Sequence, residues 1–400
     1  MKLFALVNPG LEEISKQELK ELVDSDAKIN SQALEFEVKN KEEIFKLIYH
    51  TQSIRRIVLS LKKVKKLEEL DFTKIDFNWK DFFSSELSFK VEVENIKGQD
   101  NRLEVAKQVA GKLFSQLEKE NISAEINVKT PDFLVEVFHN GEDYFIGLDL
   151  CGEELNVRSY RLFPHSASFK GDLGYFFVRK SKFKPGNKLL VGFVKDGTIA
   201  IEAAIYASGL RVQNSKEKKF SFFKLPFFKG FDFPSFFEQD LKTVKKEAEL
   251  EIKAEAKKEA KKETEQGTGT GTEIERRDLP EKNIFSFNEG TQNFTATRKN
   301  AQLAGVKNIL GTCKLSLDEL DVKFKENELD HLIFHVTTKD EGKINEIYYQ
   351  AGYVLKKKGT LLLVGRTAWN LSISEKFKLI SEEEIWRGES SYKLWLLEKK

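Results

Sequence analysis

The chain of 400 residues has only two cysteines, Cys151 and Cys313, and they stand far apart. Such a pair forms neither a disulfide framework nor a metal knuckle, and it favours a reducing, cytoplasmic setting. The five histidines lack the spacing of metal ligands, so we expect no metal site. No apolar run reaches membrane-spanning length, and the apolar part of MKLFALVNPGLEE is too short for a signal peptide. These absences argue against membrane and secreted classes.

A large charge of either sign is lacking as well. The 66 Lys and Arg residues nearly balance the 64 Asp and Glu residues, which leaves a formal net charge of +2. Binding of an acidic partner would therefore depend on local basic patches. A chain of this length is too long for one core, and we expect two or three domains.

The stretch KLLVGFVKDGTIAIEAAIYAS predicts a strand, a turn and a helix in that order. We expect the strand over Leu189–Val194, the turn over Lys195–Gly197 and the helix over Thr198–Ala207. A helix N-terminus after a strand offers free N–H groups and a positive dipole end to a nucleotide. This turn holds only one glycine, Gly197, where close approach of a ligand to the backbone usually needs several. The element is present, but its ligand-binding chemistry is depleted.

Two α+β modules are predicted before this stretch. Strands over 2–8, 33–38 and 56–61 alternate with helices over 11–23 and 42–50, which suggests a small ferredoxin-like module. A basic connector, Lys62–Lys66, leads to a second module. That module has a strand at 87–93, a helix at 102–117, strands at 124–128 and 133–138, and a hairpin into 144–150.

Phrases in this N-terminal half carry a family resemblance that extends over nearly the whole chain. LEEISKQEL, PDFLVEV and GLDLCGEELNVRSYR follow one another as in THUMP-domain RNA methyltransferases, which methylate N2 of guanine in tRNA or ribosomal RNA. The resemblance implies α+β modules followed by a Rossmann-like class I methyltransferase domain. The implied domains are a ferredoxin-like module (1–65), a THUMP RNA-binding domain (66–152), a connector (153–182) and a methyltransferase domain (183–400).

The C-terminal part alternates strands and helices as a parallel sheet requires. Strands are expected at 284–287, 329–334 and 360–364, helices at 291–305 and 343–355, and an antiparallel end pair at 376–380 and 392–397 with a turn at Gly388. A low-complexity insertion at about 242–281 interrupts this part. Its charged helix-forming residues and Gly-Thr repeat predict a solvated segment outside the core.

The resemblance implies four positions that contact S-adenosylmethionine or the target amine, and this chain departs from the family at each. In the first motif, VGFVKDGT, only Phe193, Gly197 and Thr198 match. Asn288 stands where an acid should hold the ribose, with Glu289 beside it. The adenine position falls on Lys314 or Leu315, and neither accepts a hydrogen bond from an amine.

The turn that should grip the target amine reads His335-Val336-Thr337-Thr338, without the proline and aromatic residue of the family. His335 could act as a base there, but a histidine at a strand end without a nearby carboxylate in sequence is more often structural. Loss of two acids would cost roughly 3–6 kcal/mol of donor binding. We therefore predict a decayed or absent cofactor site, with Glu289 as the residue that would rescue ribose binding.

RNA contact is predicted for clustered basic residues, because phosphate binding needs grouped cations. The set lies on the first connector and on and after the THUMP-like module: Arg55, Arg56, Lys62, Lys63, Lys65, Lys66, Lys97, Arg102, Arg158 and Arg161. The phenylalanine-rich run Phe220–Phe237 either stacks on bases, binds a protein partner, or packs on the protein itself.

Three hypotheses of function follow. The first is an RNA-binding protein of the THUMP methyltransferase family, bound to the acceptor end of tRNA, whose catalytic domain is inactive. The second is a working S-adenosylmethionine-dependent guanine-N2 methyltransferase of tRNA or ribosomal RNA with an unusual site. The third is a protein-interaction scaffold that does not bind RNA. Cofactor binding separates the first two, and RNA binding separates the first and third.

Overall fold

The computed structural model describes residues 1–213, 220–233, 235–239, 282–368 and 371–400. The predicted insertion at about 242–281 lies almost entirely outside these residues. The described chain divides into two compact units. Unit 1 comprises residues 1–157 with 220–233 and 235–236, and unit 2 comprises 158–213, 237–239, 282–368 and 371–400.

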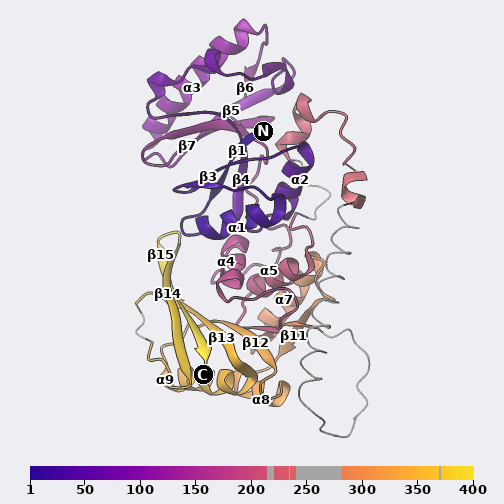
Figure 1. Ribbon diagram of the computed structural model, residues 1–400, viewed down its shortest axis with the longest axis vertical. Coiled ribbons are helices and arrows are strands. Elements are labelled where there is room, and N and C mark those ends of the chain that lie inside the picture. Colours follow the sequence, from indigo (N-terminus) through magenta and orange to yellow (C-terminus); the bar gives the residue numbers. More distant parts are fainter. Residues whose placement is uncertain (214–219, 234, 240–281, 369–370) are drawn as a thin grey trace. The chain divides into compact units, whose positions relative to one another are not determined.

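Unit 1 contains one eight-stranded sheet with the strand order β2-β3-β1-β4-β8-β7-β5-β6 (Figure 1). Its first half has the order β-α-β-β-α-β of a ferredoxin-like module, completed by the short strand β2, which the sequence analysis missed. The elements are β1 (Lys2–Val7), α1 (Glu12–Val23), β2 (Lys28–Asn30), β3 (Ala33–Glu37), α2 (Lys41–His50), β4 (Ile54–Val64), β5 (Ser88–Glu94), α3 (Gln99–Lys119), β6 (Glu125–Ile126), β7 (Phe133–His139) and β8 (Tyr144–Asp149).

Strands β4 and β8 join the two predicted N-terminal modules into one sheet. They pair antiparallel from Val58↔Asp149 to Val64↔Tyr144. Side chains from both halves, Phe4, Val58 and Phe145 among them, share one buried cluster. The prediction of a basic connector at Lys62–Lys66 is wrong in part. Lys62 and Lys63 lie inside β4, and only Lys65 and Lys66 follow it.

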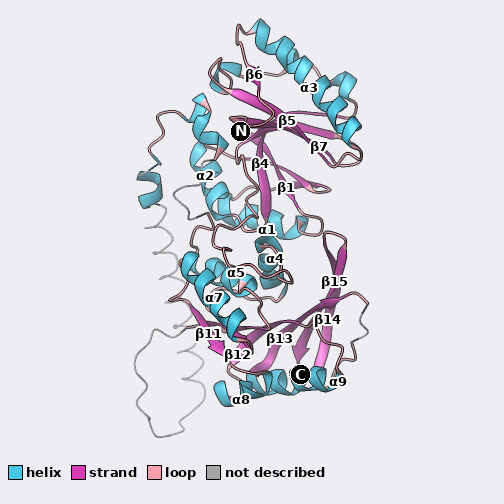
Figure 2. Cartoon of the chain, turned by 180° about the vertical axis from the view of Figure 1, so that it is seen from behind, coloured by secondary structure: helices cyan, strands magenta, loops and turns pink. Residues whose placement is uncertain are grey.

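Unit 2 contains a seven-stranded sheet with the order β11-β10-β9-β12-β13-β15-β14. The first five strands are parallel, and β15 pairs antiparallel with β13 and β14. Helices α4, α5 and α7 cover one face of the sheet and α8 and α9 cover the other (Figures 1 and 2). The expected α/β fold class, α+β modules followed by a Rossmann-like domain, is confirmed.

The predicted elements of unit 2 are present with shifted ends, but the strand β11 and the short helix α8 were not predicted. Residues Lys356–Gly359, expected after a helix, belong to a strand that runs unbroken from Leu355. Helix α4 lies in the predicted connector and was not foreseen. The elements are α4 (Gly171–Lys180), β9 (Leu189–Gly192), α5 (Thr198–Ser208), β10 (Ile284–Asn288), α7 (Thr291–Leu303), β11 (Leu310–Lys314), α8 (Leu320–Lys323), β12 (Leu329–His335), α9 (Glu341–Val354), β13 (Leu355–Arg366), β14 (Phe377–Arg387) and β15 (Ser390–Lys399).

The junction of β4 and β8 gives the first testable prediction. A Cβ on Gly147 would lie 2.3 Å from the carbonyl oxygen of Leu59. This contact could be relieved only by moving the backbone of β4. We expect Gly147→Ala to destabilise the protein by about 1–3 kcal/mol in urea unfolding followed by circular dichroism. Gly111→Ala is the matched control, because a Cβ there meets no atom within 4 Å and helix propensity favours alanine. Equal stability of the two variants would contradict this role of Gly147.

Candidate functional site

The candidate site of unit 2 lies where the order of the parallel strands reverses. Strand β9 is flanked by β10 on one side and β12 on the other, so their following loops diverge to opposite faces of the sheet. Ligands of open α/β sheets bind at the carboxyl ends of the strands at such a switch point. The three strands end here at Gly192, Asn288 and His335.

Phe193 fills the space directly after β9. Its backbone has a positive φ of 56°, and its ring packs against Phe287 and Phe334 with centroid distances of 5.3 and 5.6 Å. A Cβ on Gly192 would lie about 2.5–2.6 Å from these same two rings. An aromatic cluster therefore occupies the position above the strand where the backbone of a nucleotide-binding turn would meet its ligand.

The carboxylate of Asp196 lies one residue before Gly197, the N-cap of α5, and bonds the first residue of that helix. One oxygen accepts hydrogen bonds from the backbone N–H and the hydroxyl of Thr198, at 3.2 and 2.7 Å. The other accepts from the Arg161 guanidinium at 2.9 Å and the His165 backbone N–H at 3.2 Å. Burial alone would raise the pKa of Asp196, but hydrogen bonds from Ser168 and Thr198 and the charge of Arg161 hold it below its usual value.

The anion position at the N-terminus of α5 is thus taken by the protein's own ionised side chain. Asp196 has no exposed surface. An external carboxylate at this helix end would have to displace an acceptor that is already charged, buried and bonded. Arg161 was predicted to contact RNA, but its guanidinium forms an ion pair with Asp196.

Helix α7 closes the same turn from the other side. Gly197 has a φ of 85°, and a Cβ on it would lie 2.6 Å from the Thr297 methyl group. Asn288, at the expected ribose position, is buried and donates from its amide to the Thr297 hydroxyl at 3.2 Å. Asn300 donates to the backbone carbonyls of Asp196 and Phe163, both at 3.0 Å. On the other side of the turn, beside Ser168 and His335, lies a pocket of only about 10 Å³, which is room for about one water molecule.

A buried ion pair ties the segment before α4 to α5. The Arg158 guanidinium binds the Glu202 carboxylate at 2.7 and 3.1 Å, and the Tyr160 hydroxyl donates to the same carboxylate at 2.7 Å. Arg158 and Glu202 have no exposed side-chain surface. The prediction that Arg158 contacts RNA is therefore corrected: its charge is neutralised inside unit 2, where phosphate cannot reach it.

His335 is a buried side chain that packs against aromatic rings. Burial, reinforced by the positive charges of Lys195, Arg387 and Arg366, lowers its pKa to about 3. Its ring lies 4.8 Å from that of Phe169 and 6.2 Å from that of Tyr392. No carboxylate of the described residues hydrogen-bonds to it. The geometry supports the structural alternative for this residue.

Glu289, the neighbour of Asn288, points to a cavity of about 420 Å³. The cavity is open beside the closed turn, and Phe193 and Lys195 form its boundary with that turn. Lys314 and Leu315, the expected adenine positions, do not line it. The lining residues are Phe193, Lys195, Glu289, Leu317, Asp318, Val336, Thr337, Thr338, Asp340, Gly342, Lys343, Glu346 and Ile347.

A second cavity, of about 630 Å³, lies beyond Val336 and Thr337 and is basic. Lys339, Arg366 and Arg387 line it, and no carboxylate does. The sequence analysis missed these three cations because they follow β12, end β13 and end β14, far apart in the chain. The charges of Arg366 and Arg387 also help to lower the pKa of His335, as a positive potential in this cavity would.

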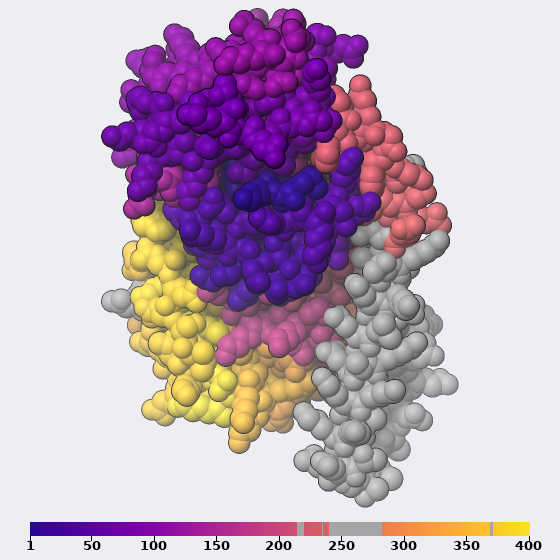
Figure 3. All heavy atoms as spheres, turned by 45° about the horizontal axis from the view of Figure 1, so that its top comes forward, coloured from indigo at the N-terminus to yellow at the C-terminus, as the bar shows by residue number. Residues whose placement is uncertain are grey.

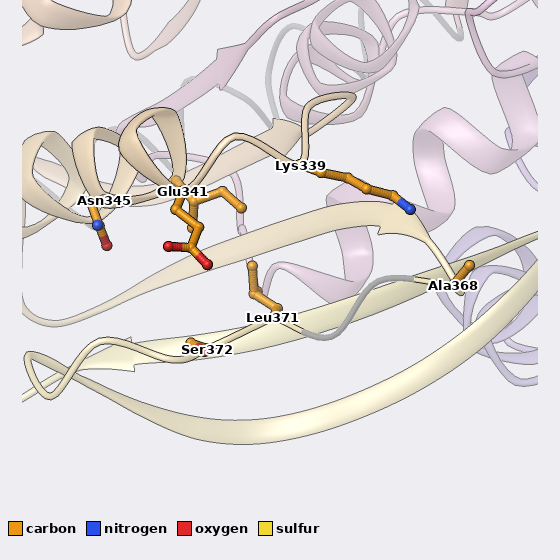
Figure 4. Close-up of a pocket in the computed structure, with 7 residues that line it drawn as sticks. Lys339, Glu341, Asn345, Ala368, Leu371 and Ser372 are labelled. Carbon is orange, nitrogen blue, oxygen red and sulfur yellow. The ribbon is translucent and has the colours of Figure 1, made fainter.

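A third cavity, of about 280 Å³, lies between the start of α9 and the segment after β13 (Figure 4). Its charged lining groups are Lys339 and Glu341, whose charges offset each other. Figure 4 shows Glu341 and Asn345 on α9, with Leu371 and Ser372 on the opposite wall. The balance of charge gives this cavity no preference for an anionic or a cationic ligand.

The predicted RNA-contacting residues of unit 1 fall into two groups. Arg55 and Arg56 are bound by carboxylates: Arg55 pairs with Glu94 and Glu154, and Arg56 pairs with Asp149 at 2.7 Å. We correct their assignment, because only 11% of each side chain is exposed. Lys63 pairs with carboxylates of its own, and Lys62 is half-buried. The exposed cations are Lys65, Lys66, Lys97 and Arg102.

Three of these exposed cations, Lys65, Lys66 and Lys97, follow strands that end on the same side of the sheet of unit 1. Val64, just before Lys65 and Lys66, pairs with Tyr144, and Tyr144 pairs with His139. The Asn95 amide, two residues before Lys97, donates to the His139 carbonyl at 2.7 Å. The ends of β4 and β5 therefore meet at the β7–β8 turn, and the lysines gather there.

Most of the described part of the phenylalanine-rich run packs on unit 1 itself. Phe220, Phe222 and Phe228 are buried. The ring of Phe45 on α2 lies 4.9 Å from that of Phe222 and 5.5 Å from that of Phe228. Figures 1 and 3 show the segment against the N-terminal part of the chain. Of the alternatives for Phe220–Phe237, the structure favours internal packing.

The sequence also predicts no metal site and no membrane-spanning segment. Among the described residues, no group of three His, Cys, Asp or Glu side chains could hold a metal ion. None of the helices in those ranges is long and apolar enough to cross a membrane. Cys151 is buried, and its sulfur lies 3.3 Å from the Ile57 backbone nitrogen.

The fold and the switch-point site define a class I methyltransferase fold preceded by α+β modules. The model of the family UPF0020, described as "RMKL-like, methyltransferase domain", matches residues 158–374. Because this match covers more than half of the chain, the protein belongs to that family, and the predicted recognition of a THUMP-type RNA methyltransferase family is confirmed.

Solved structures extend the likeness over the whole chain. TrmN from Thermus thermophilus has a TM-score of 0.66 at 17% identity, with 100% of this chain and 99% of that chain covered. SMU.472, solved in complex with SAH, has a TM-score of 0.67 at 18% identity, covering 99% and 97%. A predicted N6-adenine-specific DNA methylase from Listeria monocytogenes has a TM-score of 0.67 at 17% identity, covering 99% and 95%. At these identities the matches show a shared fold.

Burial of His335 leads to a prediction about pH. The unfolded chain protonates this imidazole near pH 6.5 and the folded chain only near pH 3, so the unfolded state binds more protons between these values. Its contribution makes stability fall as pH drops through this window, by about 1.4 kcal/mol per pH unit. His335→Phe keeps an aromatic ring against Phe169 and Tyr392, and we expect it to reduce the slope of unfolding free energy between pH 6 and 4.5 by about that amount.

His139→Phe serves as the control, because His139 lies on β7 of unit 1 and is only half-buried. Urea unfolding at several pH values measures the slope. The same slope in the wild type and in His335→Phe would mean that the imidazole is not held neutral in the folded state.

Proposed function

We propose that this member of the methyltransferase family binds RNA and does not transfer methyl groups. The observation that carries the proposal is the closed turn after β9. S-adenosylmethionine ends in an amino-acid group that needs hydrogen-bond donors and space at this turn. The Asp196 carboxylate already uses the Thr198 N–H, and the void beside it holds only about 10 Å³. The residues present do not fit the methionine end of the donor.

Two further observations support loss of transfer chemistry. Asn288 replaces an acid at the ribose position and turns its amide to Thr297. His335, at the position of the catalytic turn, is buried with a pKa of about 3, so it is too weak a base to take a proton effectively from a substrate amine at neutral pH.

RNA binding is supported by charge in both units. In unit 1, exposed lysines follow the ends of β4 and β5. In unit 2, the basic cavity is lined by three cations and by no carboxylate. Clustered cations of this kind bind phosphate groups. The family resemblance favours tRNA, and its acceptor end, as the RNA. The alternative of a protein-interaction scaffold loses support, because most of the described phenylalanine-rich run is buried within the protein.

A second candidate function, an active guanine-N2 methyltransferase, has one observation in its favour. Glu289 borders an open cavity of about 420 Å³ next to the closed turn, where it could hold a ribose. Binding of S-adenosylmethionine separates the two functions.

For the donor, we predict that isothermal titration of the full chain with S-adenosylmethionine gives a dissociation constant weaker than about 1 mM. Two lost acids and an occupied helix end remove roughly 3–6 kcal/mol from a micromolar interaction. A dissociation constant of order micromolar would establish the active alternative.

For RNA, we predict that reversing the charge of Lys65 and Lys66 weakens a gel shift of tRNA by at least tenfold at 100 mM salt. Each phosphate contact that is lost also lowers the salt dependence of binding. The matched control, Lys16→Glu with Lys28→Glu, makes the same change of charge on exposed lysines of α1 and β2. A shift that persists unchanged in the Lys65 and Lys66 variant would place the RNA elsewhere.

A further inference from the structure

We propose that unit 2 carries an RNA-binding surface at the amino ends of its parallel strands, and that this surface binds the phosphate backbone of an RNA stem. The inference rests on the proposed RNA binding and adds a surface at the end of the strands opposite to the candidate site. We call it the amino-end surface. It is formed by eight lysines: Lys182, Lys184, Lys282, Lys307, Lys325, Lys357, Lys358 and Lys376.

The topology of the sheet brings these lysines together. The loops that precede parallel strands all lie at one end of the sheet, and β14 starts at that end too, because β13 and β14 both pair antiparallel with β15. In the spatial order β11, β10, β9 and β12, the strands are preceded by Lys307, Lys282, Lys184 and Lys325. Lys376 comes directly before β14. The lysines therefore form a row across the sheet.

Strand β13 adds two lysines to the row through an irregular start. Leu329 of β12 pairs with Leu355, and His331 pairs with Thr360, so one residue of β12 faces four residues of β13. The extra residues, Lys356–Gly359, include two exposed lysines of the amino-end surface. They fill the part of the row between β12 and β15.

Hydrogen bonds hold the loops of this end against one another. The Asn283 amide donates to the Gly186 carbonyl at 3.3 Å, which joins the loops before β10 and β9. The Lys188 N–H donates to the Asp330 carboxylate at 2.8 Å, which joins the start of β9 to β12. The lysines thus project from a fixed frame, and a ligand would not have to order these loops on binding.

Positive charge exceeds negative charge at this end. Its carboxylates are those of Glu326, Glu328, Asp330, Glu375 and Glu398. Two of them are already neutralised, because Glu328 pairs with Lys188 at 3.4 Å and Asp330 pairs with Lys356 at 2.9 Å. No lysine of the amino-end surface forms an ion pair with a carboxylate of the described residues. Their charges are therefore available to phosphate groups.

Helix stability alone does not explain the row. Positive side chains in the last turn of a helix offset its dipole. This effect can account for Lys182 and Lys357, which closely follow α4 and α9. Lys184, Lys307 and Lys376 lie beyond the last turn of the described helices. These three lysines need another reason to gather at one end.

The length of the row favours an RNA stem over a small anion. Neighbouring strands are about 4.8 Å apart, so the two ends of a row across this sheet are roughly 30 Å from each other. A single phosphate would contact only a few of these lysines, whereas a stem presents a continuous line of phosphates.

The aromatic rings at this end argue for contact with the backbone rather than with unpaired bases. Phe183, Phe324 and Phe377 are buried, so they cannot stack on bases. Tyr349 is exposed, but the Lys376 ammonium lies 5.5 Å from the centre of its ring. A single strand that binds by stacking would find no row of exposed rings among the described residues of this end.

Binding of labelled tRNA to the full chain, followed by fluorescence anisotropy at several salt concentrations, tests the proposal. The test variant changes three exposed lysines of the amino-end surface: Lys184→Gln, Lys325→Gln and Lys357→Gln. We expect it to bind at least tenfold more weakly at 100 mM salt. The slope of log affinity against log salt should fall by about 2–3, since each lost phosphate contact of a duplex lowers it by about 0.9.

The matched control removes three exposed lysines of unit 1 and should bind as the wild type does: Lys2→Gln, Lys16→Gln and Lys28→Gln. A short RNA duplex should compete with tRNA at least tenfold better than a single strand of uridines of equal length.

The outcomes separate this inference from the proposed function. If the test variant keeps the affinity and salt slope of the wild type, the amino-end surface is refuted and the proposed RNA binding still stands. If the wild type does not bind tRNA, the proposed function falls and this inference falls with it. Equal competition by the uridine strand would refute the stem as the occupant. Vesicles that contain phosphatidylserine and bind the wild type but not the test variant, with tRNA binding unchanged, would make the surface a membrane site instead.

Discussion

The account of this protein depends on one buried carboxylate. Asp196 occupies the N-terminus of α5, the place where an α/β fold of this topology offers its N–H groups to an anionic ligand. The surrounding structure holds it there: Arg161 neutralises it, Asn300 fixes its backbone carbonyl, and Thr297 packs against the neighbouring Gly197. The first N–H of α5 is thus already bonded within the protein, which is the basis of our proposal that the cofactor's amino-acid group does not bind here.

This closure is local, and the two cavities beside it differ in charge. The cavity at Glu289 has a net negative lining, and the larger cavity past Val336 and Thr337 is lined by three cations. The first disfavours an anion, whereas a phosphate group suits the second. Both lie at the carboxyl ends of the parallel strands of unit 2. The proposed loss of donor binding therefore does not imply loss of every ligand-binding property of the fold.

The sequence carried enough information for the element order and for the motif departures, but not for their local consequences. Hydrophobic periodicity located most strands and helices, since each buries one regular face. It missed α4, β11, the short helix α8 and β2, whose three residues are too few to show a period. The presence of Asp196 in the turn before Gly197 is visible in the sequence, yet its burial and bonding depend on Arg161 and His165, which lie over thirty residues away. Arg55, Arg56 and Arg158 looked like RNA contacts because a charge in sequence does not reveal its partner. The basic cavity was missed since its cations come from three separate strand ends.

The central claim is that Asp196 keeps its bonds when the cofactor is offered, and a crystal of the full chain soaked in S-adenosylhomocysteine tests it most directly. The account predicts no ligand density over the turn from Phe193 to Thr198, with the Asp196 carboxylate still accepting from the Thr198 N–H. Density for the amino-acid group of the ligand on that N–H, with Asp196 rotated away and Glu289 on the ribose, would contradict it.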